Sequence, residues 1–378
     1  MQGISVFLIL LLAGTLFLLI KTHAKILWRE AALLTLISCG GWIWLTTEVF
    51  SVFKMIEFRS ILAVWLLPAT MTSALCWFKR KELRELPVVF PRLTVFEKAL
   101  LSAVALILIG TGLIALGSPP NTWDGLTYHM SRVAHWIQNK TLAYYPTHIP
   151  RQLFYSPGQE YIILHVQVLL GNDRLASMVQ WFCMAGSLLA VSLLTRELGA
   201  PQRGQWLAVL IASTIPMGIM QSNSVQGDYA ATFWLASAMF FLIKKGNTAL
   251  AQAIVCGVAL GLACLTKGTA VVFSIPIIVW IFIRAMSSFS WKKIAGAGIV
   301  FFLVAFINAP FLYRNAQFFN NKLLGPITRE FEPAINDPVS WAGFLANALR
   351  NMGTQFSMPH DTVNNLTERG LYRIAAVL

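Results

Sequence analysis

Charged side chains are scarce in this sequence. Asp, Glu, Lys and Arg make up only 12% of the 378 residues, whereas 57% are hydrophobic; soluble domains carry roughly 25% charged residues. This scarcity excludes a soluble globular protein, a disordered protein and a compact nucleic-acid-binding protein. The formal net charge of +13 does not alter that conclusion, because basic residues at the ends of apolar stretches are typical of membrane orientation signals. The sequence therefore predicts a polytopic protein of the lipid bilayer with no nucleic-acid partner.

Cysteine is also rare. The five cysteines lie inside apolar runs without the spacing of metal ligands, so we expect small buried side chains rather than disulfides. Residues 1–5 carry no positive side chain ahead of the first apolar run, which argues against a cleavable signal peptide. The sequence shows no internal repeat of the kind that many transporters contain.

Long apolar stretches, by contrast, are abundant. A helix needs about 20 apolar residues to cross the bilayer, and ten stretches approach this length. They run over about 3–20, 31–48, 60–78, 99–117, 175–195, 205–222, 228–243, 249–265, 269–284 and 293–310. We therefore predict an all-α fold with about ten transmembrane helices.

The basic residues orient these helices. With the N-terminus outside, the inner loops contain 16 Lys and Arg, and the outer segments up to residue 310 contain 7, as the positive-inside rule requires. The apolar segment 161–170 is too short to span, and counting it as a crossing would remove this bias. We expect it to lie at the interface or to dip into it. The pattern predicts a multi-pass protein of the plasma (inner) membrane.

Three regions follow from this topology. Residues 1–98 form an N-terminal three-helix unit with a basic cytoplasmic loop. Residues 99–310 form the core, including a large first outer loop at 118–174 with amphipathic interfacial helices. Residues 311–378 form an outer-face tail, and we expect the architecture to be incomplete at its apolar end. Because long loops tend to carry function, the chemistry is expected on the outer face.

Three outer acidic residues are candidates for chemistry, because ionisable residues near the membrane are commonly functional. They are Asp124, Glu160 and Asp228. We expect Glu48 and Glu57 to be solvated, since they lie at helix ends near basic residues. The alternative for Asp228 is helix capping, and for Glu160 an ordinary first-turn position, because carboxylates are stabilised at helix starts.

The surroundings of Asp124 favour more than a capping role. Prolines at 119–120 end the preceding helix, and residues 126–138 are predicted to form a new one. Its polar and apolar residues separate onto opposite sides, so we expect it to lie along the membrane surface. The polar side comprises Asp124, Tyr128, Arg132, His135 and Asn139. Capping by Asp124 stays open as the alternative.

Lys267 is the only basic residue between positions 249 and 283, in the sequence Leu-Thr-Lys-Gly. A lysine retained near the membrane indicates an anionic partner, most simply a phosphate. Arg314 lies on the same side and could reach the same anion. The alternative is a lysine that snorkels to the interface.

Together these residues resemble the GT-C superfamily of membrane glycosyltransferases, in the branch of aminoarabinose transferases and protein O-mannosyltransferases. The resemblance covers residues 99–315: an acid early in the first outer loop, a Pro-led interfacial helix, a second outer acid and the Leu-Thr-Lys-Gly turn. It implies transfer of a sugar from a polyprenyl-phosphate carrier to a glycan, lipid or protein acceptor on the outer face.

The resemblance also implies roles for individual residues. Asp124, in Trp-Asp-Gly-Leu-Thr-Tyr-His, matches the catalytic acid, Asp228 the second outer acid, and Lys267 the carrier-side lysine. Asp124 would act as the base for the acceptor hydroxyl, and Lys267 would hold the departing phosphate with help from an arginine. A single displacement would invert the anomeric carbon. The other expected substrate-binding residues are Tyr128, His129, Arg132, Arg151, Glu160 and Arg314.

The chain departs from the aminoarabinose transferases at one point. Those enzymes carry a Glu-Lys pair just before the interfacial proline, whereas this chain has Tyr155 and Ser156 before Pro157. His129 and His135 also lack a ligand spacing with the acids. We therefore expect no required cofactor, with a divalent metal left open.

A transporter or flippase of a lipid-linked or anionic substrate is the alternative function, and a structural subunit of a membrane complex is a further one. Transporters place charges at the bilayer midplane, often on broken helices of inverted repeats. Here the acids and Lys267 gather at one outer edge, which favours the glycosyltransferase.

Overall fold

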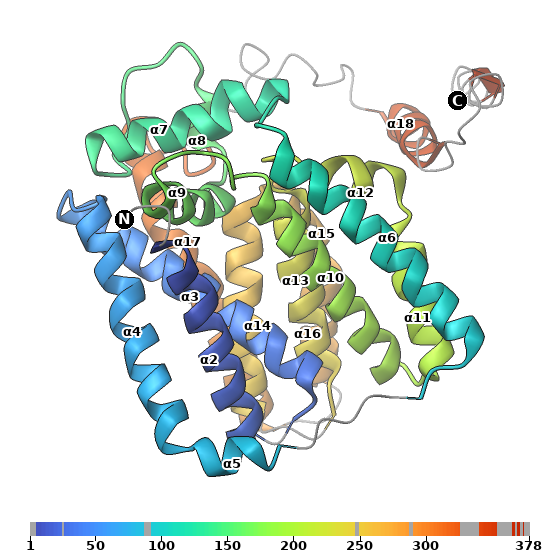
Figure 1. The fold of residues 1–378 in the computed structure, drawn as a ribbon. Helices are drawn as coiled ribbons and strands as arrows, with labels where there is room; N and C mark the ends of the chain where they lie inside the picture. Colours follow the sequence, from blue (N-terminus) through green and yellow to red (C-terminus); the bar gives the residue numbers. More distant parts are fainter. Residues whose placement is uncertain are drawn as a thin grey trace.

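The computed structural model describes residues 5–24, 26–86, 92–245, 249–286, 290–325 and 340–353, with short pieces at 365–366, 369–370 and 373. Every regular element in these residues is a helix (Figure 1). Long apolar runs become helices because a backbone in the bilayer must satisfy its own hydrogen bonds. The all-α prediction is confirmed for this part of the chain.

Six helices in the described ranges are long and apolar enough to cross a membrane. They are α2 (Phe7–Ala24), α3 (Trp28–Val52), α4 (Phe58–Phe78), α6 (Val95–Gly117), α10 (Met178–Glu197) and α17 (Trp291–Phe318). Each coincides with one of the predicted crossings, which supports a multi-pass membrane protein.

The other four predicted crossings form shorter or interrupted helices. They are α11 (Gln202–Ser213) with α12 (Pro216–Gln221), α13 (Asp228–Ile243), α14 (Ala249–Thr266), and α15 (Thr269–Phe273) with α16 (Ile275–Met286). The interruptions lie just before Pro216 and Pro276, because proline lacks a backbone donor and disfavours helix at the preceding residue. Beyond the six long helices, ten crossings stay a prediction.

Helices α10, α13, α14 and α17 form the centre of the bundle. α13 packs against both α10 and α14, and α14 packs along α17. Gly261 allows α14 and α17 to approach closely, since a Cβ atom there would lie 2.8 Å from Cδ1 of Ile307. The N-terminal helices α2 and α4 pack on each other, and α3 joins them to α10 and α14.

The predicted outer and inner segments lie at opposite ends of the bundle. Figure 1 shows α7 (Met130–Asn139), α8 (Arg151–Phe154) and α12 at one end, and α5 (Arg80–Arg84) at the other. The tail contains α18 (Trp341–Gly353), and its final residues, 374–378, lie outside the described ranges.

The apolar segment 161–170 belongs to α9 (Gly158–Leu170), whose 13 residues are too few to span a bilayer. α9 contacts α3, α4, α7 and α14, and most of its side chains are buried. It is thus embedded in the protein, and its first turn carries Glu160 of the predicted site.

Candidate active site

Three separate segments meet at the N-terminal end of α9. The Nε2 atom of Gln159 donates to the carbonyl of Val225 at 2.8 Å. A Cβ atom at Gly158 would lie 2.7 Å from Oγ1 of Thr266, and one at Gly125 would lie 2.7 Å from Cγ2 of Val225. Only glycine permits these approaches. The region is termed the α9 corner and consists of residues 122–129, 158–160, 222–228 and 266–267.

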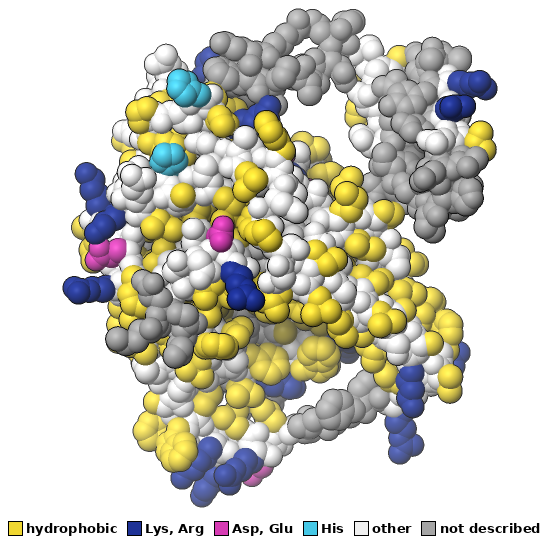
Figure 2. All heavy atoms as spheres, turned by 45° about the horizontal axis from the view of Figure 1, so that its top comes forward, with side chains coloured by type: hydrophobic (Ala, Val, Ile, Leu, Met, Phe, Trp, Pro, Cys, Tyr) yellow, Lys and Arg dark blue, Asp and Glu magenta, His cyan; other side chains and the backbone are white. Residues whose placement is uncertain are grey.

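Six of the predicted site residues lie in the α9 corner: Asp124, Tyr128, His129, Glu160, Asp228 and Lys267. They are carried by segments that join at the end of the bundle where α7 and α12 lie (Figure 1). Figure 2 shows that charged side chains on this end form small isolated patches among hydrophobic and uncharged side chains. The folding of the chain therefore brings together acids that are far apart in the sequence.

Asp124 stands at the start of a π-helical turn, η1 (Gly125–His129), and is half-buried. Its side chain makes no capping hydrogen bond; instead, Oγ1 of Thr122 accepts from the N–H of Gly125 at 3.2 Å. Burial, together with the neighbouring Asp124 carboxylate, raises the pKa of Tyr128. The carboxylate is thus engaged with a side chain rather than with the helix start, in a type of turn that is frequent at functional sites.

Glu160 joins this turn to α9. Its Oε1 atom accepts from Nδ1 of His129 at 2.9 Å and from Nη1 of Arg132 at 3.0 Å, while Oε2 is buried without a hydrogen-bond partner among the described residues. Burial alone would raise the pKa of Glu160, but the charges of Arg132 and His129 outweigh it and lower the pKa below its ordinary value. Glu160 is therefore an anion that fixes the ring of His129 with its proton on Nδ1.

Arg132 is completely buried, although it lies on the predicted polar side of this helix. Its Nε donates to the carbonyl of Gln152 and its Nη2 to the carbonyl of Arg151, both at 2.7 Å. Because carbonyl and carboxylate oxygens match these donors, the guanidinium does not need water. Tyr128 is buried too, whereas the apolar Trp123 is 81% exposed. The Arg151 side chain is half-buried.

Asp228 and Lys267 form an ion pair at the edge of the α9 corner. Nζ of Lys267 lies 2.5 Å from Oδ1 of Asp228, and the two side chains remain 38% and 37% exposed. Asp228 begins α13 and Lys267 directly follows α14, so each charge has the sign that its helix end favours. Oδ2 of Asp228 is buried and finds no hydrogen-bond partner in the described ranges.

Arg314 pairs with a different carboxylate. Its guanidinium donates to both oxygens of Glu48 at 2.6 and 2.9 Å, and the Tyr161 hydroxyl donates to the same carboxylate at 2.6 Å. The prediction that Glu48 is solvated is wrong, since this side chain is buried; Glu57, as expected, is partly exposed. Burial of Glu48 is tolerated because the planar guanidinium fork matches a carboxylate. Arg314 and Lys267 thus have separate partners.

The part of the chain that is described contains no group of three or more His, Cys, Asp or Glu side chains arranged to hold a metal. His129 is held by Glu160, and His135 stacks on Tyr145 with ring centroids 4.0 Å apart. All five cysteines are free. The steps proposed below use no metal.

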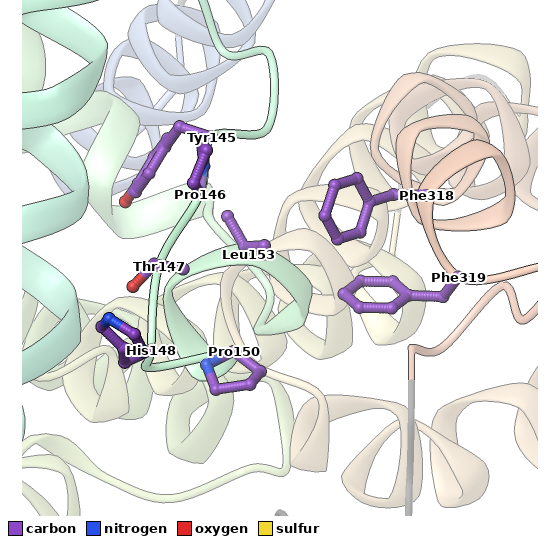
Figure 3. Close-up of a pocket in the computed structure, with 8 residues that line it drawn as sticks. All are labelled: Tyr145, Pro146, Thr147, His148, Pro150, Leu153, Phe318 and Phe319. Carbon is purple, nitrogen blue, oxygen red and sulfur yellow. The ribbon is translucent and has the colours of Figure 1, made fainter.

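A pocket of about 530 Å³ lies beside α8. Figure 3 shows Phe318 and Phe319, at the end of α17, facing the loop that leads into α8. The lining residues are Tyr145, Pro146, Thr147, His148, Pro150, Leu153, Phe318 and Phe319. The pocket is mainly apolar and aromatic, and sequence reasoning did not predict it because its two walls are far apart in the chain.

Sequence reasoning also missed three polar residues around α9. Glu48 and Tyr161 hold Arg314, and Gln159 holds the loop that contains Val225. A signal for Glu48 existed, because an acidic residue within a long apolar stretch is expected to have a partner. Nothing in the sequence identifies the partner of Gln159.

Comparison with known proteins bears directly on this site. Residues 155–313 match the family model described as dolichyl-phosphate-mannose-protein mannosyltransferase. The matched segment contains Glu160, Asp228 and Lys267, and it begins after Asp124. No curated protein and no solved structure matches the chain. The match implies membrane glycosyltransferase activity of the GT-C type. The resemblance to the GT-C superfamily is confirmed: over residues 155–313 this chain carries the sequence pattern of the dolichyl-phosphate-mannose-protein mannosyltransferase family.

Proposed function

We propose that the protein transfers a sugar from a polyprenyl-phosphate donor to a hydroxyl group of a glycan, lipid or protein acceptor. In this proposal the reaction takes place on the non-cytoplasmic face of the plasma (inner) membrane. The observation that carries the proposal is the α9 corner, which holds a carboxylate that caps no helix, Asp124, and an accessible cation, Lys267, at one end of an apolar bundle. Displacing a lipid phosphate needs a base for the acceptor hydroxyl and a cation for the departing phosphate.

In the proposed reaction, the acceptor oxygen forms a bond to the anomeric carbon while the bond from that carbon to the phosphate oxygen breaks. Asp124 takes the proton of the acceptor hydroxyl. Lys267 stabilises the charge that develops on the departing phosphate. One such displacement inverts the anomeric carbon. No group of the chain forms a covalent intermediate in this scheme.

The remaining residues of the α9 corner would bind and orient the sugar. Oε2 of Glu160 is buried without a hydrogen-bond partner among the described residues, and in this proposal it accepts from a sugar hydroxyl. His129 and Tyr128 lie beside it on the π-helical turn. Arg314 is committed to Glu48, so Lys267 is the principal phosphate contact in this proposal.

The test is turnover of a panel of polyprenyl-phosphate sugars by purified protein in detergent, comparing wild type with Asp124→Asn. Loss of a positioned base should lower the transfer rate by about 10²–10⁴-fold, whereas asparagine keeps the size and hydrogen-bonding capacity of the side chain. Asp173→Asn is the matched control, since Asp173 is an exposed acid of the same outer loop.

A folded Asp124→Asn protein that transfers sugar at the wild-type rate would exclude Asp124 as the base. Detergent solution has no vesicle interior, so turnover there also separates a transferase from a transporter. A protein that consumes none of the panel, but moves a lipid-linked sugar across vesicles, would support the alternative.

A further inference from the structure

The ion pairs of the described residues fall into two kinds. Three are buried and held by further hydrogen bonds or by close packing: Arg132–Glu160, Arg314–Glu48 and Lys244–Glu30. The pair Lys267–Asp228 is different, because more than a third of each side chain is exposed and a single contact joins them. Exposed pairs of this kind contribute little to stability and exchange partners readily. Among the cations paired in the site, Lys267 is therefore the one that can change partner.

Among the described residues, Lys267 is the cation that holds Asp228. Its Oδ1 atom contacts Lys267, and its Oδ2 atom is buried without a hydrogen-bond partner in the described part of the chain. A phosphate that binds Lys267 must therefore displace Asp228 from the ammonium and then lie close to a carboxylate of the same sign. Like charges at such short range repel, and the repulsion grows with the charge of the phosphate.

The charge of the phosphate changes during the proposed reaction, on which this inference rests. The donor is a phosphodiester with one negative charge. When the bond to the anomeric carbon breaks, its electron pair stays with the phosphate oxygen, and the product is a monoester. A phosphate monoester carries about 1.5 to 2 negative charges at neutral pH. Lys267 alone would thus bind the product more tightly than the substrate and would slow turnover.

We propose that Asp228 acts as an internal anion that competes with the phosphate for Lys267 and so promotes release of the polyprenyl monophosphate product. The carboxylate returns to the ammonium as the product leaves, and it discriminates against the monoester because the monoester is more highly charged. Asp228 is then a residue that limits product affinity rather than one that adds to substrate affinity.

The experiment measures binding of polyprenyl monophosphate to purified full-length protein in detergent, for wild type and Asp228→Asn. Removing the competitor should tighten binding about threefold to tenfold, which is the gain expected if Lys267 is free only a third to a tenth of the time in wild type. Binding of a polyprenyl-phosphate sugar, the diester, should tighten less. Uncharged polyprenol should bind both proteins equally, which separates the phosphate from the chain.

Two further variants make the outcome decisive. Glu57→Gln frees Lys140 from a comparably exposed ion pair and should leave monophosphate binding unchanged. Asp228→Ser removes the charge with a different, smaller side chain, so a folding defect of one variant does not decide the result. Asp228→Asn in a Lys267→Ala background should no longer tighten binding.

The possible results distinguish this inference from the proposed function. If Asp228→Asn and Asp228→Ser bind the monophosphate as wild type does, or more weakly, the competition is refuted while Lys267 can still be the phosphate contact. If Lys267→Ala binds monophosphate as tightly as wild type, the phosphate contact itself is refuted and the inference with it.

Discussion

At the scale of single residues, the predicted site divides into charges that are fixed and charges that are accessible. Arg132 has hydrogen-bond partners for all three guanidinium nitrogens, and Oε1 of Glu160 joins it to His129. Asp124 and Lys267, by contrast, are not enclosed. Fixed groups that orient a few accessible ones are the arrangement expected of a preorganised site.

Glu160→Gln should destabilise the protein strongly, because it leaves the Arg132 guanidinium buried without a counter-charge. Breaking such a buried pair costs about 3–5 kcal/mol. The measurement is thermal unfolding in detergent at neutral pH, with Glu57→Gln as the control, since Glu57 is in an exposed pair and its loss should change little.

The pH dependence of the same variant gives a second check. The folded-state pKa of Glu160 is lowered by Arg132 and His129, so its contribution is present above the ordinary carboxylate pKa and is lost as the pH falls through the folded value. The stability difference between wild type and Glu160→Gln should therefore shrink in acid. A difference that is constant from neutral to strongly acidic pH would contradict the assignment of an ionised Glu160.

At the scale of elements, α9 is the helix on which the site depends. A second polar contact joins it to the N-terminal helices: the indole Nε1 of Trp65 donates to Nδ1 of His165 at 2.9 Å, and Nε2 of His165 lies 2.9 Å from Oγ1 of Thr47. Because an indole can only donate, the proton of His165 must be on Nε2. The neutral ring thus bonds α4 on one side and α3 on the other.

His165 should make folding sensitive to mild acid. Burial lowers the pKa of His165 to about 3, whereas an unfolded histidine titrates near 6.5. The unfolded chain therefore binds the extra proton first, and stability falls as the pH drops below about 6.5 towards 3. Between pH 6.5 and 4.5 this single group accounts for roughly 2–3 kcal/mol.

The corresponding measurement compares melting temperatures at pH 7 and pH 4.5 for wild type and His165→Asn. The variant should lose part of the acid sensitivity, at the cost of lower stability at pH 7. His148→Asn is the control, because His148 is exposed and should leave the pH dependence unchanged. Equal acid sensitivity in His165→Asn and wild type would mean that the ring is not neutral in the folded protein.

The helices themselves could be predicted from hydrophobicity, but their local irregularities and contacts could not. The apolar stretches locate α2, α3, α4 and the other long helices within a few residues. The π-helical turn after Asp124 has no periodicity signal of its own, and the predicted polar side of this helix contains Arg132, which is completely buried. The buried position of Arg132 depends on carbonyls of α8, a contact that spacing along one helix cannot reveal.

At the scale of the whole molecule, the two ends of the bundle differ in charge. The basic residues of α5 lie at the end opposite the α9 corner (Figure 1). From this difference the positive-inside rule predicts that α5 lies in the cytoplasm and the site outside. The helix arrangement supports the prediction that these segments lie on opposite sides of the membrane. The prediction of which side is cytoplasmic follows from the distribution of Lys and Arg.

Labelling of single cysteines in a cysteine-free background tests this orientation. A membrane-impermeant thiol reagent added to intact cells should label positions 127 and 172 and should not label position 84, and all three should react after permeabilisation. Positions 172 and 84 are exposed in the structure, so protection cannot be ascribed to burial there. Labelling of 84 with protection of 172 would reverse the topology and place the site in the cytoplasm.

The sequence does not reveal which distant charged residues pair with each other. Glu48 and Arg314 are 266 positions apart, and Lys267 and Asp228 are 39 apart. A single sequence shows that each charge needs a partner, but not which of several opposite charges the fold supplies. The site residues could therefore be named as a set, while their pairing required the three-dimensional structure.

The Glu48–Arg314 pair has a consequence for how the protein is made. Translation proceeds at about 5–20 residues per second, so the 266 residues that separate the two side chains represent a delay on the order of tens of seconds. During this interval the carboxylate of Glu48, near the C-terminal end of α3, has been synthesised and its partner Arg314 has not. The buried contact that ties α3 to α17 can therefore form only after almost the whole described bundle has been synthesised.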